Sequence, residues 1–296
     1  MKHLRYMEAL LRHGHFGRAA EACHISQPAL SIQIRELESM LGAPLIERGG
    51  RQIRPTPFGE AFAARASEIL RSVDELADLA RLHRSPFAAA LRIGVIPTVA
   101  PYMLPAIIER LTALHPGLDL RPREAMTRTL IGELLEGRLE AAIVALPFSE
   151  ASLVEHPLFE EEFVLIRPAR DAQAPVPDGE ALGRMRLLLL EEGHCFRDQS
   201  LVYCRLPTVR TGDIIEGSSL TTLVQLVGAG IGVTLIPEMA VAVELHSARV
   251  AMARLPEPRP RRTIGMIWRK SNPLADQLAK VAEVVRAVRP SSEGGC

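Results

Sequence analysis

Two cysteines nine residues apart are the residues best suited to do chemistry in this chain. Cys195 and Cys204 bound the segment CFRDQSLVYC, and Cys195 follows His194 just after the apolar run LLLL. A position just past a strand end is where α/β sheets usually bind ligands. A reactive cysteine must be a reachable thiolate, favoured by nearby cations or helix N-termini. His194 and Arg197 are the adjacent candidates, and Arg262 could approach from a late strand.

A structural role is the alternative for each cysteine. Isolated intracellular cysteines usually behave as small buried hydrophobes, and the residues alone leave this open for Cys195 and Cys204. We expect Cys23 in a helical core, whereas Cys296 on the SSEGGC tail could form adventitious intermolecular disulfides. No second ligand pair at zinc spacing accompanies Cys195 and His194, so we predict neither a metal nor a cofactor.

The spacing of the two cysteines carries a mechanical consequence. A disulfide needs Cα atoms roughly 4.4 to 6.8 Å apart, whereas nine helical steps span about 13 Å at ~1.5 Å each. If a substantial part of Phe196 to Tyr203 is helical when the thiols are reduced, a disulfide between these two cysteines could close only after local unfolding.

Composition limits the class of protein. The chain has 296 residues, 35 Lys+Arg against 35 Asp+Glu, and 47% hydrophobic residues. That length allows two domains or one large one, and the composition excludes long disorder and a disulfide-stapled miniprotein. Apolar runs of membrane-spanning length are missing, and charges interrupt the N-terminal apolar pattern. We therefore expect a cytosolic protein without a membrane partner, where thiols are normally reduced.

The first 55 residues are locally basic, with eight Lys+Arg against five Asp+Glu. Apolar spacings of three and four predict short helices at 4–11 and 17–24. A third is predicted from Ser26, an N-cap candidate followed by Pro28, to Gly42. Three short helices with a tight junction are typical of a helix-turn-helix.

A turn and a long helix are predicted next. The stretch LIERGGRQIRPT reads as a hairpin whose arginines surround Gly49-Gly50, forming a basic wing. From Pro57 onward, apolar residues recur at alternating steps of four and three, which indicates a helix that pairs with another helix. The alternative is a long helix packed on its own domain. The helix should end near Ser85-Pro86. The repeat consists of Phe62, Ala66, Ile69, Val73, Leu76 and Ala80.

From residue 91 onward the pattern is that of an α/β protein. Short apolar strands alternate with helices, which favours largely parallel sheets. The pattern restarts after residue 163, so two α/β subdomains with a cleft between them are expected. The predicted strands lie at 91–96, 118–125, 141–146, 163–166, 187–190, 232–237 and 263–268, and the predicted helices at 105–114, 130–136, 220–227 and 275–288.

This order of elements resembles the LysR-type transcriptional regulators. The segment HFGRAAEACHISQPALSIQIRELESMLGAPLIERGGRQIRPTPFGE matches their N-terminal motif almost throughout, and the resemblance covers the whole chain. It implies an all-α winged helix-turn-helix domain at 1–56, a linker and dimerisation helix at 57–86, and a periplasmic-binding-protein-like α/β regulatory module at 87–296. Subdomain I would comprise about 87–161 and 262–296, and subdomain II about 162–261.

A recognition helix presents its N-terminal residues to base edges in the major groove. Arginines of the wing bind phosphate or the minor groove, which adds affinity more than specificity. One departure from the family pattern is Ile32, where many members carry arginine, and it removes one expected DNA contact. The predicted DNA-binding residues are Gln27, Pro28, Ser31, Gln33, Arg35, Arg48, Arg51 and Arg54.

Five further blocks resemble the members of this family that sense hydrogen peroxide: GHCFRDQSLVYC, IPTVAPYMLP, EAMT, GAGIGVTLIP and PRRTIG. The resemblance implies that Cys195 is oxidised to a sulfenic acid, which Cys204 resolves to a disulfide that cellular thiol reductants reverse. With that disulfide, we expect refolding of the segment between the two cysteines to be a redox switch that re-sets a dimer interface. The resemblance also implies that Arg262 stabilises developing negative charge. The residues implied to surround bound peroxide are Thr98, Thr127, His194, Cys195, Asp198 and Arg262.

The predicted function is that of a cytoplasmic, non-enzymatic, peroxide-sensing activator. Oxidation would switch on antioxidant genes under oxidative stress through RNA polymerase, with a dimer of dimers (a homotetramer) bound to inverted repeats in double-stranded DNA. A regulator of the same family with a small organic effector in its cleft is the alternative. A thiol peroxidase and a solute-binding protein are disfavoured by the DNA-binding module and the expected lack of a signal peptide.

Overall fold

The computed structural model describes residues 1–47, 53–82, 90–148, 150–205 and 215–288. Two compact units result, Met1–Arg81 and Leu82–Cys296, and each is described by itself. The predicted wing residues Arg48 and Arg51, and Cys296 on the tail, lie outside the described residues. Within the described part, no helix combines the length and the apolar character needed to span a membrane.

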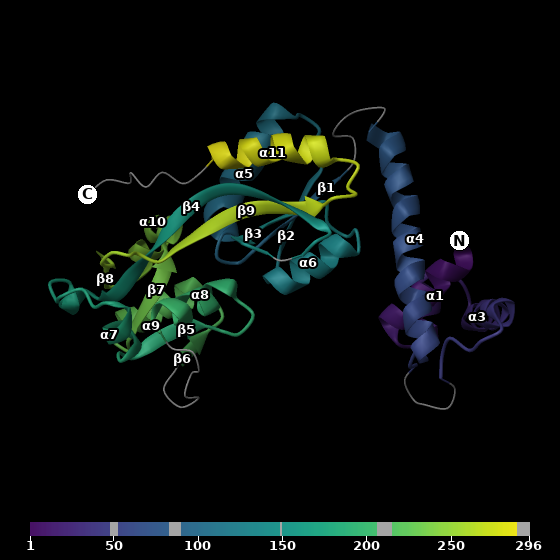
Figure 1. Ribbon diagram of the computed structural model, residues 1–296, viewed down its shortest axis with the longest axis horizontal. Helices are drawn as coiled ribbons and strands as arrows, with labels where there is room; N and C mark the ends of the chain where they lie inside the picture. Colours follow the sequence, from purple (N-terminus) through teal and green to yellow (C-terminus); the bar gives the residue numbers. More distant parts are fainter. Residues whose placement is uncertain (48–52, 83–89, 149, 206–214, 289–296) are drawn as a thin grey trace. The chain divides into compact units, whose positions relative to one another are not determined.

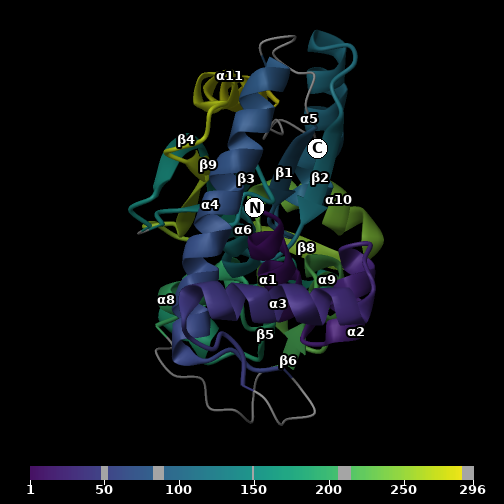
Figure 2. The same ribbon diagram turned by 90° about the vertical axis from the view of Figure 1, so that its right-hand side faces the viewer.

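The first unit begins with the three predicted helices: α1 (Lys2–His13), α2 (Phe16–Ala22) and α3 (Gln27–Leu41) (Figure 2). The Ser26 hydroxyl accepts a hydrogen bond from the Ala29 amide at 3.3 Å and caps α3. Gly42 ends the helix in the left-handed region, with φ of 67°. The helix-turn-helix prediction is confirmed. The core comprises Met7, Leu10, Ala19, Ala20, Leu30, Ile34, Leu37, Leu45 and Ile46.

A buried carboxylate joins α3 to the segment that follows it. Glu38 accepts hydrogen bonds from the amides of Leu45 at 2.9 Å and Ile46 at 3.3 Å.

The long helix α4 (Pro57–Leu82) comes next. Along its predicted repeat, Ala66 is buried within the unit whereas Ile69 is 51% exposed. Pairing of α4 with a second helix stays a prediction.

The second unit is built on a nine-stranded sheet in the order β2-β1-β3-β9-β4-β7-β5-β6, with β8 paired to β4. The strands are β1 (Leu91–Val95), β2 (Leu120–Glu124), β3 (Ala141–Leu146), β4 (Leu153–Pro168), β5 (Leu187–Leu190), β6 (Ile215–Gly217), β7 (Val233–Pro237), β8 (Val250–Arg254) and β9 (Arg261–Arg269).

Two hydrophobic cores divide this unit into lobes. The first lobe contains β1, β2, β3, α5 (Ala100–Leu114), α6 (Thr127–Leu135) and α11 (Ala275–Ala287). The second lobe contains β5 to β8, α7 (Gly179–Gly183), α8 (Cys195–Tyr203), α9 (Leu220–Gly228) and α10 (Val241–Glu244). The strands β4 and β9 run side by side along the sheet (Figure 1). β4 pairs with β9 up to Glu162, and with β7 and β8 beyond it.

The sheet is mixed, so the expectation of largely parallel pairing holds only within each lobe. β1 is parallel to β2 and β3, and β5 is parallel to β6 and β7. β4 and β9 are antiparallel to their neighbours. The sequence pattern detected only the end of β4, because its first part, LVEHPLFEEE, contains many charged residues and does not read as a buried strand.

Two helices begin earlier than predicted. α5 begins at Ala100 and carries Pro101 in its first turn, so Pro105 lies inside the helix rather than at its start. α6 begins at Thr127, three residues before the expected start. A proline fits the first turn of a helix well, and here the earlier of two prolines occupies it. These starts place Tyr102 and Thr127 in first turns.

Candidate functional site

Three predicted residues lie where strands of the two lobes end. Thr98 follows β1, Thr127 is the first residue of α6 after β2, and Cys195 is the first residue of α8 after β5. With His194 they line one small pocket, together with Ile96, Pro97, Met126 and Gly193. The carboxyl ends of parallel strands are the usual ligand-binding edge of α/β sheets. Residues almost a hundred positions apart are thereby brought together.

The position of Cys195 at the start of α8 places it beside free backbone N–H groups. The helix dipole and these amides favour negative charge at such a position. His194 is the N-cap residue and is 5% exposed. Burial lowers the pKa of His194, while nearby Glu191 acts in the opposite direction, and the lowered pKa favours the neutral imidazole. The amides of α8, rather than His194, supply positive potential beside the sulfur.

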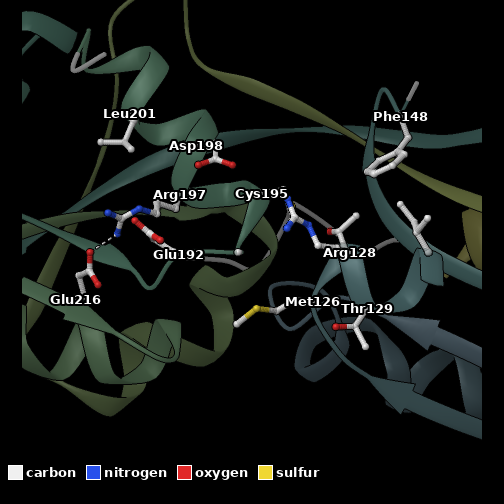
Figure 3. A pocket seen from close by; sticks show the side chains of 13 residues that line it. Met126, Arg128, Thr129, Phe148, Glu192, Cys195, Arg197, Asp198, Leu201 and Glu216 are labelled. Atoms are coloured by element: carbon white, nitrogen blue, oxygen red, sulfur yellow. Dashed lines mark ion pairs between the residues drawn. The ribbon is translucent and has the colours of Figure 1, made fainter. Parts of the chain in front are cut away.

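Arg197, a candidate cation beside Cys195, is held by partners in the second lobe. Its buried guanidinium donates to the Leu190 carbonyl at 2.7 Å and pairs with Glu216 at 2.8 Å (Figure 3). Those contacts tie α8 to β5 and β6. Arg197 is therefore a structural residue of the second lobe.

Arg262 reaches the site from β9, and its charge is balanced. Its Nε donates to Glu161 Oε1 at 2.7 Å, and its side chain is fully buried. Nη1 donates to Thr98 Oγ1 at 2.7 Å, and Nη2 donates to the Thr98 carbonyl at 3.1 Å. The guanidinium also lies 5.3 Å from the centre of the Phe196 ring. Because Arg262 donates to Thr98 Oγ1, the hydroxyl hydrogen of Thr98 remains available for another acceptor.

Thr127 presents a polar atom without a partner. Its Oγ1 is buried and makes no hydrogen bond among the described residues, and the residue is 7% exposed. A buried hydroxyl without a partner costs about 1–3 kcal/mol. It lines the pocket of Cys195. A small molecule with hydrogen-bonding oxygens would satisfy it there.

A wider cleft adjoins the small pocket and shares Met126, Thr127, Gly193 and Cys195 with it. Asp198, the remaining predicted site residue, is exposed and lines this cleft rather than the small pocket. Figure 3 shows Arg128 on one side of the cleft and Asp198 and Glu192 on the other. Asp198 therefore stands at the approach to the sulfur, on the same helix, and is not in direct contact with the small pocket.

Cys204 lies at the opposite end of α8. It is the C-terminal cap residue and is 2% exposed within the core of the second lobe. Burial raises the pKa of Cys204 to about 11. Both Cys195 and Cys204 are free thiols. Among the described residues, no group of three or more His, Cys, Asp or Glu side chains is placed to hold a metal ion.

Five of the predicted DNA-contacting residues lie on α3, and Arg54 lies between α3 and α4. Gln27, Pro28, Arg35 and Arg54 are exposed, whereas Ser31 and Gln33 are half-buried. The Gln33 amide donates to Glu36 at 2.7 Å, and Arg35 donates to the Ser31 carbonyl at 3.3 Å. Ile32 is 48% exposed on the same helix.

Cys23 was expected in the core and is not there. It is the C-cap residue of α2, is half-buried, and does not belong to the core cluster of its unit. The helix ends at Ala22, two residues before the predicted end at residue 24, so Cys23 is its C-cap residue rather than an interior residue of the helix.

Glu161 is a site residue that the pattern of the sequence concealed. It lies in the run Glu160-Glu161-Glu162, which reads as a solvated charge cluster. In β4 the side chains alternate, so Glu161 points inward while Glu160 is exposed. Its Oε2 accepts from the Met239 amide at 3.2 Å. The alternation of side chains along a strand is the pattern that could have identified Glu161 as an inward-facing residue.

The chain belongs to the LysR family of bacterial helix-turn-helix regulators. Residues 1–60 match the model of the bacterial regulatory helix-turn-helix proteins of the LysR family. Residues 84–290 match the model of the LysR substrate binding domain. Together the two models cover nearly the whole chain, which agrees with the helix-turn-helix unit and the two-lobed α/β unit described above.

Relatives of known name are similar over almost the full length. The chain is 41% identical over 288 residues to a probable hydrogen peroxide-inducible genes activator of Streptomyces viridosporus, covering 96% of this chain and 92% of that protein. It is 38% identical over 291 residues to the DNA-binding transcriptional dual regulator OxyR of Escherichia coli K12, covering 97% and 95%.

Solved structures of OxyR proteins are also similar to this chain over almost its full length. A full-length OxyR from Pseudomonas aeruginosa, with a cysteine replaced by aspartate, matches with a TM-score of 0.77 and 37% identity, covering 100% of this chain and 98% of that one. A cysteine mutant of Corynebacterium glutamicum OxyR with bound hydrogen peroxide matches with a TM-score of 0.66 and 32% identity, covering 97% and 91%.

Proposed function

We propose that this protein is a DNA-binding transcription regulator that senses hydrogen peroxide through Cys195 and Cys204. The observation that carries the proposal is their arrangement on α8, with Cys195 at the N-terminus beside a pocket and Cys204 buried at the other end. The similarity to regulators named for peroxide induction supports it. Gln27, Pro28, Ser31, Gln33, Arg35 and the wing arginines, Arg54 among them, would contact inverted-repeat DNA.

The first step is oxidation of the Cys195 sulfur. The thiolate attacks one oxygen of peroxide, the O–O bond breaks, and hydroxide leaves and takes up a proton as water. The product is a sulfenic acid. Thr98 and Thr127 would orient the two peroxide oxygens, since each has hydrogen-bonding capacity in the pocket. Arg262 would act on the peroxide through its hydrogen bond to Thr98. His194 would line the pocket as an imidazole, and Asp198 would lie at the approach to the sulfur.

The second step is closure of the disulfide. The Cys204 sulfur attacks the Cys195 sulfur, a bond between them forms, and the hydroxyl of the sulfenic acid leaves as a second water. In the reduced form α8 covers the whole interval, so the cysteines stand about 13 Å apart along its axis at ~1.5 Å per residue. Bonded cysteines need Cα atoms within roughly 7 Å. α8 must therefore unwind, and this refolding is the switch.

The remaining features of the proposed function concern assembly and partners. The oxidised regulator would act in the cytoplasm as a dimer of dimers on promoter DNA and engage RNA polymerase. Cellular dithiols would return it to the reduced state. Each oxidation consumes one peroxide and leaves a disulfide, so a regulator without rapid re-reduction would consume peroxide stoichiometrically rather than by sustained turnover.

Intact mass spectrometry of the full chain with stoichiometric peroxide tests this function. We expect a loss of two hydrogens that maps to a peptide pair linking Cys195 and Cys204. Cys195→Ser should abolish both the mass change and peroxide-dependent transcription. Retained peroxide-dependent transcription in that variant would instead favour an organic effector in the cleft. Sustained peroxide turnover would indicate a peroxidase.

A further inference from the structure

Tyr102 connects the two lobes of the regulatory unit. It lies in the first turn of α5 and packs against the hydrophobic cores of both lobes. Its hydroxyl donates to Glu244 Oε1 at 2.7 Å. Glu244 ends α10 in the second lobe and is 2% exposed. A hydrogen bond to a buried carboxylate therefore spans the junction between the lobes.

The carboxylate of Glu244 is held by two hydroxyl groups. Besides Tyr102, the Thr221 hydroxyl of α9 donates to Glu244 Oε1 at 2.9 Å. Thr221 and Glu244 belong to the same lobe, so only the Tyr102 bond crosses between lobes. Burial, and then the bond to Glu244, raise the pKa of Tyr102, so its phenol keeps its proton and remains a donor. Hydrogen bonds to charged groups contribute more than neutral ones.

This junction is close in the chain to the cysteine site. Tyr102 lies one helical turn after Thr98, which lines the pocket of Cys195. Cys195 itself packs against the core of the first lobe, whereas Cys204 belongs to the core of the second. Bringing the two sulfurs together takes Cys195 out of its packing on the first lobe, takes Cys204 out of the core of the second lobe, or does both. Either movement removes contacts beside the junction, where the Tyr102–Glu244 bond holds the two lobes in the arrangement of the reduced protein.

We propose that Tyr102 and Glu244 form an interlobe latch that stabilises the reduced protein relative to the disulfide form. They are positioning residues, since neither lines the pocket of Cys195. The latch sets how oxidising the environment must be before the disulfide predominates. This inference rests on the proposed function, because it requires that Cys195 and Cys204 form a reversible disulfide.

The test is the thiol–disulfide equilibrium of the full chain in glutathione buffers. In that exchange two glutathione thiols reduce one protein disulfide and leave as oxidised glutathione. Tyr102→Phe removes the latch hydroxyl and keeps the ring that packs on both cores. We expect its equilibrium to shift about tenfold toward the disulfide, or about 30 mV toward a lower potential. Glu244→Gln keeps the acceptor oxygen without its charge and should shift it less, in the same direction.

Thr221→Val is the matched control. It removes a hydrogen bond of similar length to the same carboxylate oxygen, but within one lobe. We expect a lower unfolding free energy and an unchanged thiol–disulfide equilibrium. An equal shift in Thr221→Val, no shift in the Tyr102 and Glu244 variants, or a shift toward the thiols would each overturn the latch. A wild-type chain that forms no Cys195–Cys204 disulfide would instead overturn the proposed function.

Discussion

Cys195 and Cys204 occupy the two ends of one helix, the first as its opening residue and the second as its C-terminal cap. In the proposed mechanism, the N-terminal amides of this helix lie beside the Cys195 sulfur, and the intact helix keeps the Cys204 sulfur away from it. Oxidation of Cys195 would then lead to a disulfide only after α8 unwinds.

The two thiols should differ sharply in reactivity toward an alkylating agent. Because the pKa of Cys204 is raised from 9.0 to about 11, it stays protonated as well as buried at pH 8. We expect iodoacetamide to label Cys195 and spare Cys204 there, read by peptide mass mapping. An unfolded chain in urea should be labelled at both. Equal labelling of Cys204 in the folded and unfolded chains at pH 8 would contradict the structure.

The same shift predicts how stability depends on pH. The unfolded chain loses the Cys204 proton near pH 9, whereas the folded chain keeps it until about pH 11. The unfolded state is therefore favoured progressively as the pH rises through this window. Urea unfolding of the reduced protein should show stability falling between pH 9 and 11, and Cys204→Ala should show a smaller fall. An identical pH dependence in both proteins would exclude Cys204 as its source.

Thr127→Val should slow oxidation of Cys195 without changing its reaction with other electrophiles. The variant keeps the shape of the side chain and removes the hydroxyl that has no partner in the pocket. Loss of one preorganised donor lowers such rates on the order of 10²-fold. Stopped-flow oxidation by peroxide measures the effect, and iodoacetamide labelling of Cys195 is the control. A parallel loss in both reactions would indicate a distorted site.

Removing the carboxylate of Glu161 should destabilise the regulatory unit strongly. Glu161→Leu leaves the buried guanidinium of Arg262 without its partner at 2.6 Å. Breaking a buried ion pair on one side costs about 3–5 kcal/mol. Denaturant unfolding measures it, and the double variant with Arg262→Met should recover part of the loss. Glu162→Gln, whose side chain is more exposed than that of Glu161, keeps the Arg262 pair and should cost less than Glu161→Leu.

Two glycines offer a matched pair for testing the packing of α8. A Cβ on Gly179 would lie 2.3 Å from the Tyr203 carbonyl oxygen, at the end of α8, whereas a Cβ on Gly132 in α6 meets nothing within 4 Å. Gly179→Ala should therefore destabilise the protein by about 1–3 kcal/mol. Gly132→Ala should stabilise it by roughly 0.5–1 kcal/mol, since alanine favours a helix interior. Thermal unfolding of both variants provides the comparison, and equal melting temperatures would argue against the contact.

The DNA-binding residues should separate into two kinds. Arg54→Ala should weaken binding to all sequences and reduce the salt slope by about one, as loss of a phosphate contact does. Gln27→Ala should relax the preference for one base pair at a cost of about 1–3 kcal/mol. Binding titrations at several salt concentrations on a specific and an unrelated duplex distinguish them. Glu60→Ala in α4 is a control that should leave affinity unchanged.

Local patterns were sufficient to predict much of the fold. The helices α1 to α3, with Ser26 and Gly42 at the ends of α3, follow from spacing and capping within a few residues. The buried strands β1, β3, β5 and β7 are short apolar runs, and their own residues are sufficient to predict them as strands. The first part of β4 was missed because its inward residues include charged ones, and β6 because it has only three residues, IEG.

The sequence by itself offered the candidate side chains: the residues gave a cysteine pair and a late arginine, and the family resemblance added two threonines. Only the tertiary structure decided their environment. Arg197 pairs with Glu216, Arg262 pairs with Glu161, and burial lowers the pKa of His194. The physical reason is that charge and desolvation depend on contacts between residues up to about 160 positions apart, such as Thr98 and Arg262. No local pattern encodes which of these groups meet.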